Sequence, residues 1–124
     1  MIVKCIKLPP ANYEYVSHIA VDEEYLVFAL LLEKGELRYC IADNQSHETN
    51  MPVWYPEAFF TVTNTEIPAG WHIGKEDGDV IVTFKEWASS NGEFYYWLVE
   101  DRDSELMLYN KYIQQMASMH PQFS

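Results

Sequence analysis

The segment YLVFALLLEKGELRYCIA, residues 25–42, decides the fold class. Its first part, Tyr25–Leu32, is the longest apolar run of the chain, and its length suits a buried strand or a short helix. The next residues, EKGE at 33–36, place a glycine where a tight turn requires a positive φ angle. Apolar and polar residues then alternate, as is typical of a half-exposed strand. The segment therefore predicts a β-hairpin with strands at 24–33 and 36–43.

Short extended segments and turns are expected on both sides of this hairpin. The first eight residues, MIVKCIKL, alternate and are rich in β-branched side chains, which predicts a strand that ends at Pro9–Asn12. The eight polar residues Asp43–Asn50 predict a loop. The remaining expected elements are an extended piece at 52–56, a helical turn at 56–59, a strand at 60–63, a turn at 67–71, a turn at 77–79, a strand at 80–84 and a loop at 89–92.

The end of the chain predicts an amphipathic helix. Asp103 or Ser104 can cap it, and His120–Pro121 marks its end. At 100° per residue, the residues that share its apolar face are Leu106, Leu108, Tyr109, Tyr112, Ile113, Met116 and Ala117. The preceding segment Phe94–Val99 is either a strand or the beginning of this helix.

Short antiparallel strands followed by a helix define the expected fold class. We expect an α+β protein with a strongly bent antiparallel sheet, or a small open barrel, and a C-terminal amphipathic helix. Because 124 residues is a usual size for one domain, we expect a single domain over 1–124. Hydrophobic residues make up 48% of the chain, which is enough for a packed core.

The charge of the chain restricts its partners. Eight Lys and Arg against 19 Asp and Glu give a net charge of −11. A protein this acidic lacks the basic surface that direct binding to nucleic acid or to an anionic membrane requires. The natural partner of such a surface is a basic protein, although acidity can also serve solubility alone.

The location of the protein is expected to be the cytoplasm. No apolar run is long enough to span a membrane, and the N-terminal residues lack the apolar core of a secretory signal. In a reducing compartment Cys5 and Cys40 are expected to be buried thiols, and they could lie on neighbouring strands.

The sequence contains no recognisable catalytic or metal-binding motif. It has no GxSxG, HExxH, GxGxxG or phosphate-binding loop, and its histidines, His18, His47, His72 and His120, are scattered. We therefore expect no metal, no cofactor and no enzymatic activity. A hydrolase using a pair of carboxylates is the alternative that an acidic chain always leaves open.

Acidic clusters and aromatic residues are the remaining candidates for function. Carboxylates attract a basic partner over long range, and aromatic side chains supply the dry centre of an interface. The candidate partner-binding residues are Asp22, Glu23, Glu24, Trp54, Tyr55, Trp71, Glu76, Asp77, Asp79, Glu100, Asp101 and Asp103. The alternative for each tryptophan is a place in the core.

Two resemblances give these residues a context. The rhythm of Tyr25–Trp71, including WYPEAFF at 54–60 and IPAGW at 67–71, resembles small bacterial and phage-encoded proteins with SH3-like barrels. In size, acidity and lack of catalytic motifs, the whole chain resembles bacterial toxin-immunity proteins, including those of contact-dependent inhibition systems. This resemblance implies a protein that binds and neutralises a cognate toxin domain, often a basic nuclease. The alternative is a small ligand-binding or regulatory module in which Trp54, Tyr55 and Trp71 line a pocket.

Overall fold

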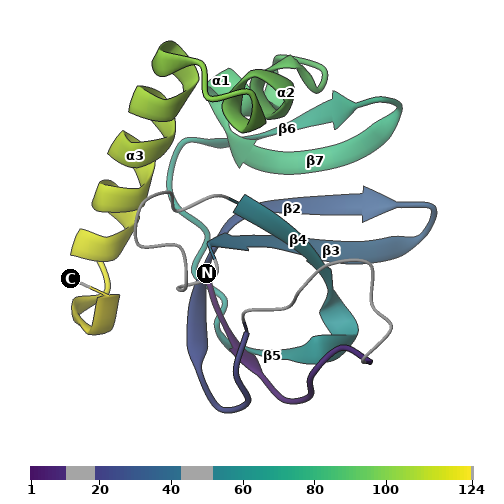
Figure 1. Cartoon of the computed structure of the whole chain (residues 1–124), viewed down its shortest axis with the longest axis vertical. Helices are drawn as coiled ribbons and strands as arrows, with labels where there is room; N and C mark the ends of the chain where they lie inside the picture. The colour runs from purple at the N-terminus through teal and green to yellow at the C-terminus, as the bar shows by residue number, and fades with distance from the viewer. Residues whose placement is uncertain (11–18, 43–51, 124) are drawn as a thin grey trace. The chain divides into compact units, whose positions relative to one another are not determined.

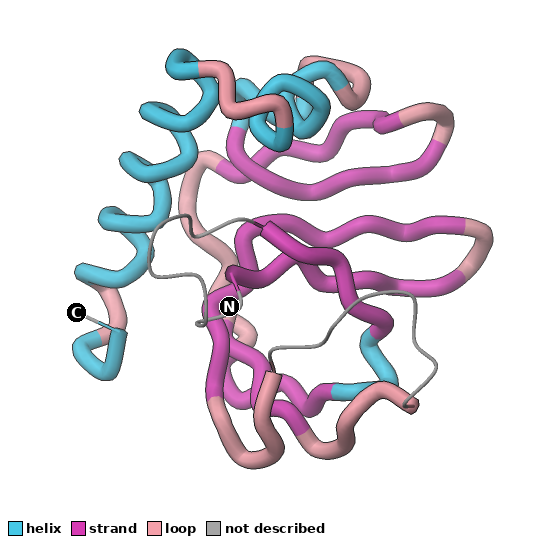
Figure 2. Tube along the Cα trace, in the orientation of Figure 1, coloured by secondary structure: helices cyan, strands magenta, loops and turns pink. Residues whose placement is uncertain are grey.

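The computed structural model describes residues 1–10, 19–42 and 52–123 (Figure 1). It forms two compact units, which we call unit 1 (Met1–Ile67) and unit 2 (Pro68–Ser124). Unit 1 consists of strands and one 3-10 turn, whereas unit 2 combines a hairpin with helices (Figure 2). The predicted α+β class, with a bent antiparallel sheet and a C-terminal helix, is confirmed. The expected single domain stays a prediction.

Unit 1 is an antiparallel sheet in the order β4-β3-β2-β1-β5. Its elements are β1 (Ile2–Cys5), β2 (Glu24–Glu33), β3 (Glu36–Ala42), β4 (Pro52–Pro56), the 3-10 turn η1 (Glu57–Phe59) and β5 (Phe60–Asn64). The start of β2 pairs with β1 and the rest of β2 pairs with β3, with a register shift between Val27 and Ala29. Such a shift bends a strand. Within unit 1 the strand order ends at β4 and β5, so its sheet is not closed, and the shift in β2 bends it.

The predicted hairpin is present as β2 and β3. Glu33 pairs with Glu36, which leaves a loop of Lys34 and Gly35 with φ angles of 51° and 81°. Two successive positive φ angles define the type I′ turn, whose twist matches that of the strands it joins. The segments expected at 52–56, 56–59 and 60–63 are also confirmed as β4, η1 and β5.

The first strand is shorter than predicted, and the loop regions are only partly described. β1 ends at Cys5 because the chain bends at Lys7, whose carbonyl accepts a hydrogen bond from the Cys5 thiol at 3.3 Å. The loop predicted at Asp43–Asn50 and the end of the Pro9–Asn12 segment lie outside the described residues, as do His18 and His47.

Aromatic side chains fill the core of unit 1. Tyr25, Tyr39 and Tyr55 each make an edge-to-face contact with Phe60, with centroid distances of 6.4, 5.9 and 6.0 Å. Offset and edge-to-face geometries are the favourable arrangements for aromatic pairs. All four rings are buried. They belong to β2, β3, β4 and β5, so this cluster joins most of the sheet.

Both cysteines are buried thiols outside any disulfide, as predicted. They do not lie on neighbouring strands, because Cys5 is on β1, Cys40 is on β3, and β2 runs between these strands.

Unit 2 begins with an antiparallel hairpin and continues with helices. Its elements are β6 (Trp71–Glu76), β7 (Asp79–Phe84), α1 (Lys85–Ala88), α2 (Glu93–Val99), α3 (Asp103–Ser118) and the 3-10 turn η2 (Pro121–Phe123). The turn at 77–79, the strand at 80–84 and the turn at 89–92 are confirmed, whereas β6 and α1 were not predicted. Phe94–Val99 is neither a strand nor the start of the last helix, because it forms the separate helix α2.

The contact between β6 and α1 depends on a glycine. A Cβ atom at Gly74 would collide with the backbone carbonyl of Ala88, so only glycine permits this close approach. Figure 1 shows α1 and α2 beside the β6–β7 hairpin, with α3 running away from them toward the C-terminus. Trp87 of α1 and Phe94 of α2 stack at 5.5 Å between centroids, and both also contact Phe84 at the end of β7.

The pattern of the last helix is confirmed. α3 spans Asp103–Ser118, and Arg102 occupies the N-cap position one residue before the predicted caps. Every residue assigned to its apolar face is buried or half-buried, and Met107, which interrupts the pattern, is exposed. In the described part of the chain, no helix is long and apolar enough to cross a membrane.

Candidate functional site

The predicted site residues are divided between the two units. Unit 1 contains Asp22, Glu23, Glu24, Trp54 and Tyr55. Unit 2 contains Trp71, Glu76, Asp77, Asp79, Glu100, Asp101 and Asp103. These residues therefore form local groups, and we describe each group by itself.

The acidic group of unit 1 takes part in holding strands together. Asp22 is exposed and lies 4.0 Å from the ammonium of Lys4 on β1. Glu24 at the start of β2 accepts a hydrogen bond of 2.7 Å from the hydroxyl of Thr63 on β5. Exposed pairs of this kind contribute little stability, typically less than about 1 kcal/mol. Glu23 contacts β1 through its backbone, because its carbonyl accepts a hydrogen bond of 3.0 Å from the amide of Cys5.

Tyr55, a candidate partner-binding residue, is not exposed, contrary to what a role at an interface would require. Its side chain is 0% exposed, because alternate residues of β4 point into the sheet core, where Tyr55 meets Phe60. Trp54, the preceding residue, is half-buried. Trp71 is also half-buried and contributes to a pocket described below.

The acidic group of the β6–β7 turn is partly built into unit 2. Asp77 and Gly78 form its two-residue loop with φ angles of 50° and 89°, which is again a type I′ turn. Glu76 is half-buried, and burial raises the pKa of its carboxyl, as the nearby charges of Asp77 and Asp79 also do. The nearby indole N–H of Trp87 partly offsets the rise in the pKa of Glu76.

The acidic group between α2 and α3 is fully exposed. We use the name α2–α3 corner for Tyr96, Trp97, Val99, Glu100, Asp101 and Asp103, all of which are exposed. The amide of Asp101 donates to the carbonyl of Leu98, and the amide of Arg102 donates to the carbonyl of Trp97. This pair of bonds is a Schellman motif, which ends α2 and places Asp101 at a φ angle of 59°. Glycine is the usual residue at this position, so an aspartate here is held at some cost.

The sequence analysis missed the aromatic residues of the α2–α3 corner. Tyr96 and Trp97 are 55% and 38% exposed, and their rings meet edge to face at 5.0 Å. The signal for them was the helical spacing of Phe94 and Leu98, both buried, which turns Tyr96 and Trp97 outward once the segment is a helix. Tyr96 and Trp97, and not Tyr55, are thus exposed aromatic residues that lie beside carboxylates.

A cation already lies on one of these rings. The guanidinium of Arg102 is 4.9 Å from the centroid of Trp97, within the range of a cation–π contact. The Nε atom of Arg102 is also 3.3 Å from the Glu105 carboxylate. Trp97 of the α2–α3 corner and the neighbouring Glu105 of α3 therefore hold a guanidinium of the same chain.

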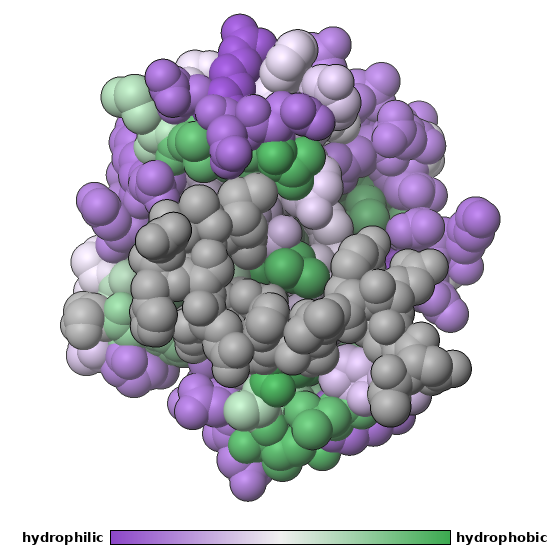
Figure 3. Space-filling model, viewed as in Figure 1, coloured by the Kyte–Doolittle hydropathy of each residue, from purple (hydrophilic) through white to green (hydrophobic). Residues whose placement is uncertain are grey.

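Figure 3 shows how polarity is distributed over one face of each unit. Hydrophilic residues cover most of the helices of unit 2 in this view. Apolar residues gather at the end of unit 1 where β5 lies, and the exposed apolar residues next to β1 and β2 are Ile6, Leu8 and Val21. This apolar surface carries no exposed aromatic residue among those described.

A pocket of about 250 Å³ lies in unit 2. Its lining residues are Pro68, Ala69, Gly70, Trp71, Phe84, Tyr112, Gln115, Met116 and Met119. The Tyr112 ring stacks on Phe84 with 4.0 Å between centroids and an interplanar angle of 11°. The Tyr112 hydroxyl donates a hydrogen bond of 2.7 Å to Glu86, and this bond, with burial and the Glu86 charge, raises the pKa of Tyr112 to about 12.

Within residues 1–10, 19–42 and 52–123, no three His, Cys, Asp or Glu side chains are grouped so as to hold a metal ion. Comparisons of the chain with models of protein families, with curated proteins and with solved structures give no match. The two resemblances noted in the sequence stay predictions.

Proposed function

We propose that this protein binds a basic protein partner through the α2–α3 corner and acts as an immunity protein that neutralises a cognate bacterial toxin domain. It acts by binding and not by catalysis, in the cytoplasm of the cell that it protects. The observation that carries the proposal is the exposed pair Tyr96 and Trp97 among the exposed carboxylates of Glu100, Asp101 and Asp103.

The two kinds of side chain have different tasks in such an interface. A net charge of −11 attracts a basic partner and accelerates its approach. The aromatic pair supplies area that becomes dry on contact, and tryptophan and tyrosine are the residues most often found at the energetic centre of interfaces. A nuclease toxin that binds phosphates presents lysine and arginine, which carboxylates can engage as phosphates would.

The contact of Arg102 with Trp97 supports this choice of partner. It shows that the Trp97 ring is oriented and accessible enough to hold a guanidinium at 4.9 Å. A partner arginine would use the same chemistry, either on the remaining exposed part of the ring or in place of Arg102.

The test uses the product of the toxin gene adjacent to the gene for this protein. We expect a one-to-one complex whose association rate falls steeply with added salt. The triple variant Glu100→Gln/Asp101→Asn/Asp103→Asn should slow association by about ten-fold or more at low salt. Asparagine keeps the positive φ angle at position 101 accessible.

A matched control separates the site from the overall charge. The variant Glu36→Gln/Glu57→Gln/Glu66→Gln removes the same number of charges from exposed positions of unit 1 that are not candidate partner-binding residues. It should leave the association rate within about two-fold of the unmodified protein, because these charges are not in the proposed interface. Equal effects of the two triple variants would show that only net charge matters. The absence of an adjacent toxin gene, together with no basic partner in the native cell, would overturn the proposal.

A further inference from the structure

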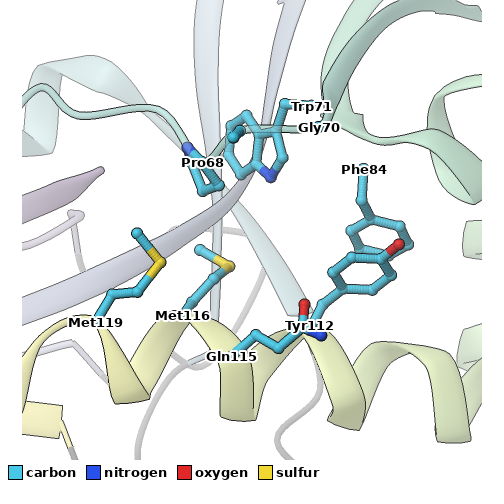
Figure 4. Close-up of a pocket in the computed structure, with 9 residues that line it drawn as sticks. Pro68, Gly70, Trp71, Phe84, Tyr112, Gln115, Met116 and Met119 are labelled. Atoms are coloured by element: carbon cyan, nitrogen blue, oxygen red, sulfur yellow. The ribbon is translucent and has the colours of Figure 1, made fainter.

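The pocket of unit 2 has walls that are flat or flexible. Figure 4 shows Trp71 reaching into the space, with Phe84 and Tyr112 on one side and Pro68 on the other. Met116 and Met119 rise from α3 toward the Pro68–Trp71 segment. Methionine adapts its shape and makes favourable contacts with aromatic rings. Flat walls with adaptable thioethers suit a planar ligand.

The chemistry of the lining restricts the charge of the ligand. None of the nine lining residues is charged, although the chain as a whole has a net charge of −11. The Tyr112 hydroxyl already donates to Glu86. The indole nitrogen of Trp71 points toward the space in Figure 4, so an N–H donor faces the ligand. A charged ligand would lose its hydration without gaining an opposite charge, whereas a neutral ligand with one acceptor would gain a hydrogen bond.

The volume restricts the size of the ligand. About 250 Å³ lies between the ~150 Å³ cavity that admits benzene and the roughly 300–1,000 Å³ of sites for drug-sized ligands. We propose that this pocket binds an uncharged planar aromatic molecule of one or two fused rings that carries a hydrogen-bond acceptor. This proposal is independent of the toxin-immunity function, because none of its lining residues belongs to the α2–α3 corner.

The occupant is a free small molecule and not a segment of a protein. A stable protein interface buries about 800 Å² on each partner, with an apolar centre. The outward face of α3 beside the pocket is polar, since Lys111, Gln114, Gln115 and Ser118 are all exposed. The apolar side chains next to the pocket thus lie in the hollow itself, which a small molecule fills by itself, whereas the exposed Met107 lies on α3 outside the pocket.

The experiment uses coumarin as the probe and follows the methyl groups of ¹³C-methyl-methionine by NMR. Coumarin should shift the signals of Met116 and Met119 saturably, with a Kd on the order of 0.1–1 mM, and leave Met107 unchanged. Octahydrocoumarin, its saturated and non-planar analogue, should bind about ten-fold more weakly. Coumarin-3-carboxylate, which adds a negative charge, should also bind about ten-fold more weakly.

Two tryptophan variants locate the site. Met119→Trp places a large side chain at an exposed edge of the pocket and should weaken coumarin binding by about ten-fold or more, which corresponds to roughly 1.4 kcal/mol. Met107→Trp makes the same change at an exposed position of α3 outside the pocket and should leave the Kd within about two-fold. Gln115→Trp, at another exposed lining position, replaces Met119→Trp if that variant does not fold.

Three results would overturn the proposal. They are no saturable shift at Met116 and Met119 with coumarin near its solubility limit, equal binding of coumarin and octahydrocoumarin, and equal weakening by Met119→Trp and Met107→Trp. None of them bears on toxin binding.

Discussion

The β6–β7 turn and the α2–α3 corner have similar acidic sequences but opposite environments. Each places an aspartate at a positive φ angle, Asp77 at 50° and Asp101 at 59°. In the turn, Asp77 precedes Gly78 in the type I′ pair that hairpins favour, and the adjacent Glu76 is half-buried. At the corner, Asp101 occupies a position that usually holds glycine, beside exposed aromatic rings. Carboxylates of one kind can therefore belong to the folded framework or to a surface available for binding.

The largest expected effect is on the free energy of unfolding, and it distinguishes Trp87, near the β6–β7 turn, from Trp97 of the α2–α3 corner. Trp87, whose indole N–H lies near the Glu76 carboxyl, is 1% exposed and packs against Phe84 and Phe94. Trp87→Ala should lower the free energy of unfolding by about 3–5 kcal/mol, because it leaves a cavity in the core of unit 2. Trp97→Ala should lower it by roughly 1–2 kcal/mol. Urea denaturation measures both values, and equal losses would contradict the distinction between the two regions.

The pH dependence of stability should report the burial of the Glu76 carboxyl. Because burial raises its pKa above the ordinary 4.5, the folded protein holds this proton more tightly than the unfolded chain does. The contribution of Glu76 is therefore greatest below pH 4.5 and is lost as the pH rises through the raised pKa. Glu76→Gln should gain stability relative to the unmodified protein as the pH rises above 4.5 and through the raised pKa, and urea denaturation at a series of pH values measures this gain. A stability difference between the two proteins that does not change with pH would contradict the raised pKa.

A smaller and opposite effect is expected at Asp101. Asp101→Gly should raise the free energy of unfolding by up to about 1 kcal/mol, because glycine adopts the left-handed conformation without the steric cost of a Cβ atom. The same variant should bind the proposed toxin more slowly, since a charge of the corner is lost. Thermal denaturation and association kinetics test the two halves together. A variant that is less stable, or that associates unchanged, would remove Asp101 from the proposed site.

The smallest expected effect concerns the hydrogen bond between the Tyr112 hydroxyl and the exposed carboxylate of Glu86. The pKa of Tyr112 is raised to about 12, so the stability from its bond to Glu86 is fully present below pH 10 and is lost as the pH rises through about 12. Tyr112→Phe should lower the free energy of unfolding at neutral pH by at most about 1 kcal/mol. Tyrosinate absorbance should lose its titration step near pH 12 in this variant. Tyr96→Phe, at the corner, should leave that step in place.

The sequence predicted the elements whose side-chain pattern agrees with their environment. The hairpin of β2 and β3 followed from an apolar run, a glycine turn and an alternating strand, and α3 followed from a complete apolar face. β6 was missed because its pattern is reversed: Ile73 is 78% exposed, whereas Glu76 is half-buried. Its Gly74, which reads as a strand-weakening residue, is required by the contact with Ala88.

The candidate site was only partly predictable for a related reason. The acidic residues of the α2–α3 corner were identified from charge alone, but their aromatic neighbours were not. The segment 94–99 has a β-prone composition, and alternation would bury every second residue, whereas the helix buries Phe94 and Leu98 and exposes Tyr96 and Trp97. In the same way Trp54 and Tyr55 are equivalent in sequence, and only the register of β4 makes Tyr55 a core residue.

The separation of Cys5 and Cys40 by a central strand has a practical consequence. Each thiol is shielded on its own strand, and burial raises the pKa of Cys5, so little of the reactive thiolate is present at neutral pH. Alkylation then requires the sheet of unit 1 to open around each site. The two native cysteines are therefore built-in reporters of opening at β1 and at β3, whose labelling rates can be compared without introducing any probe.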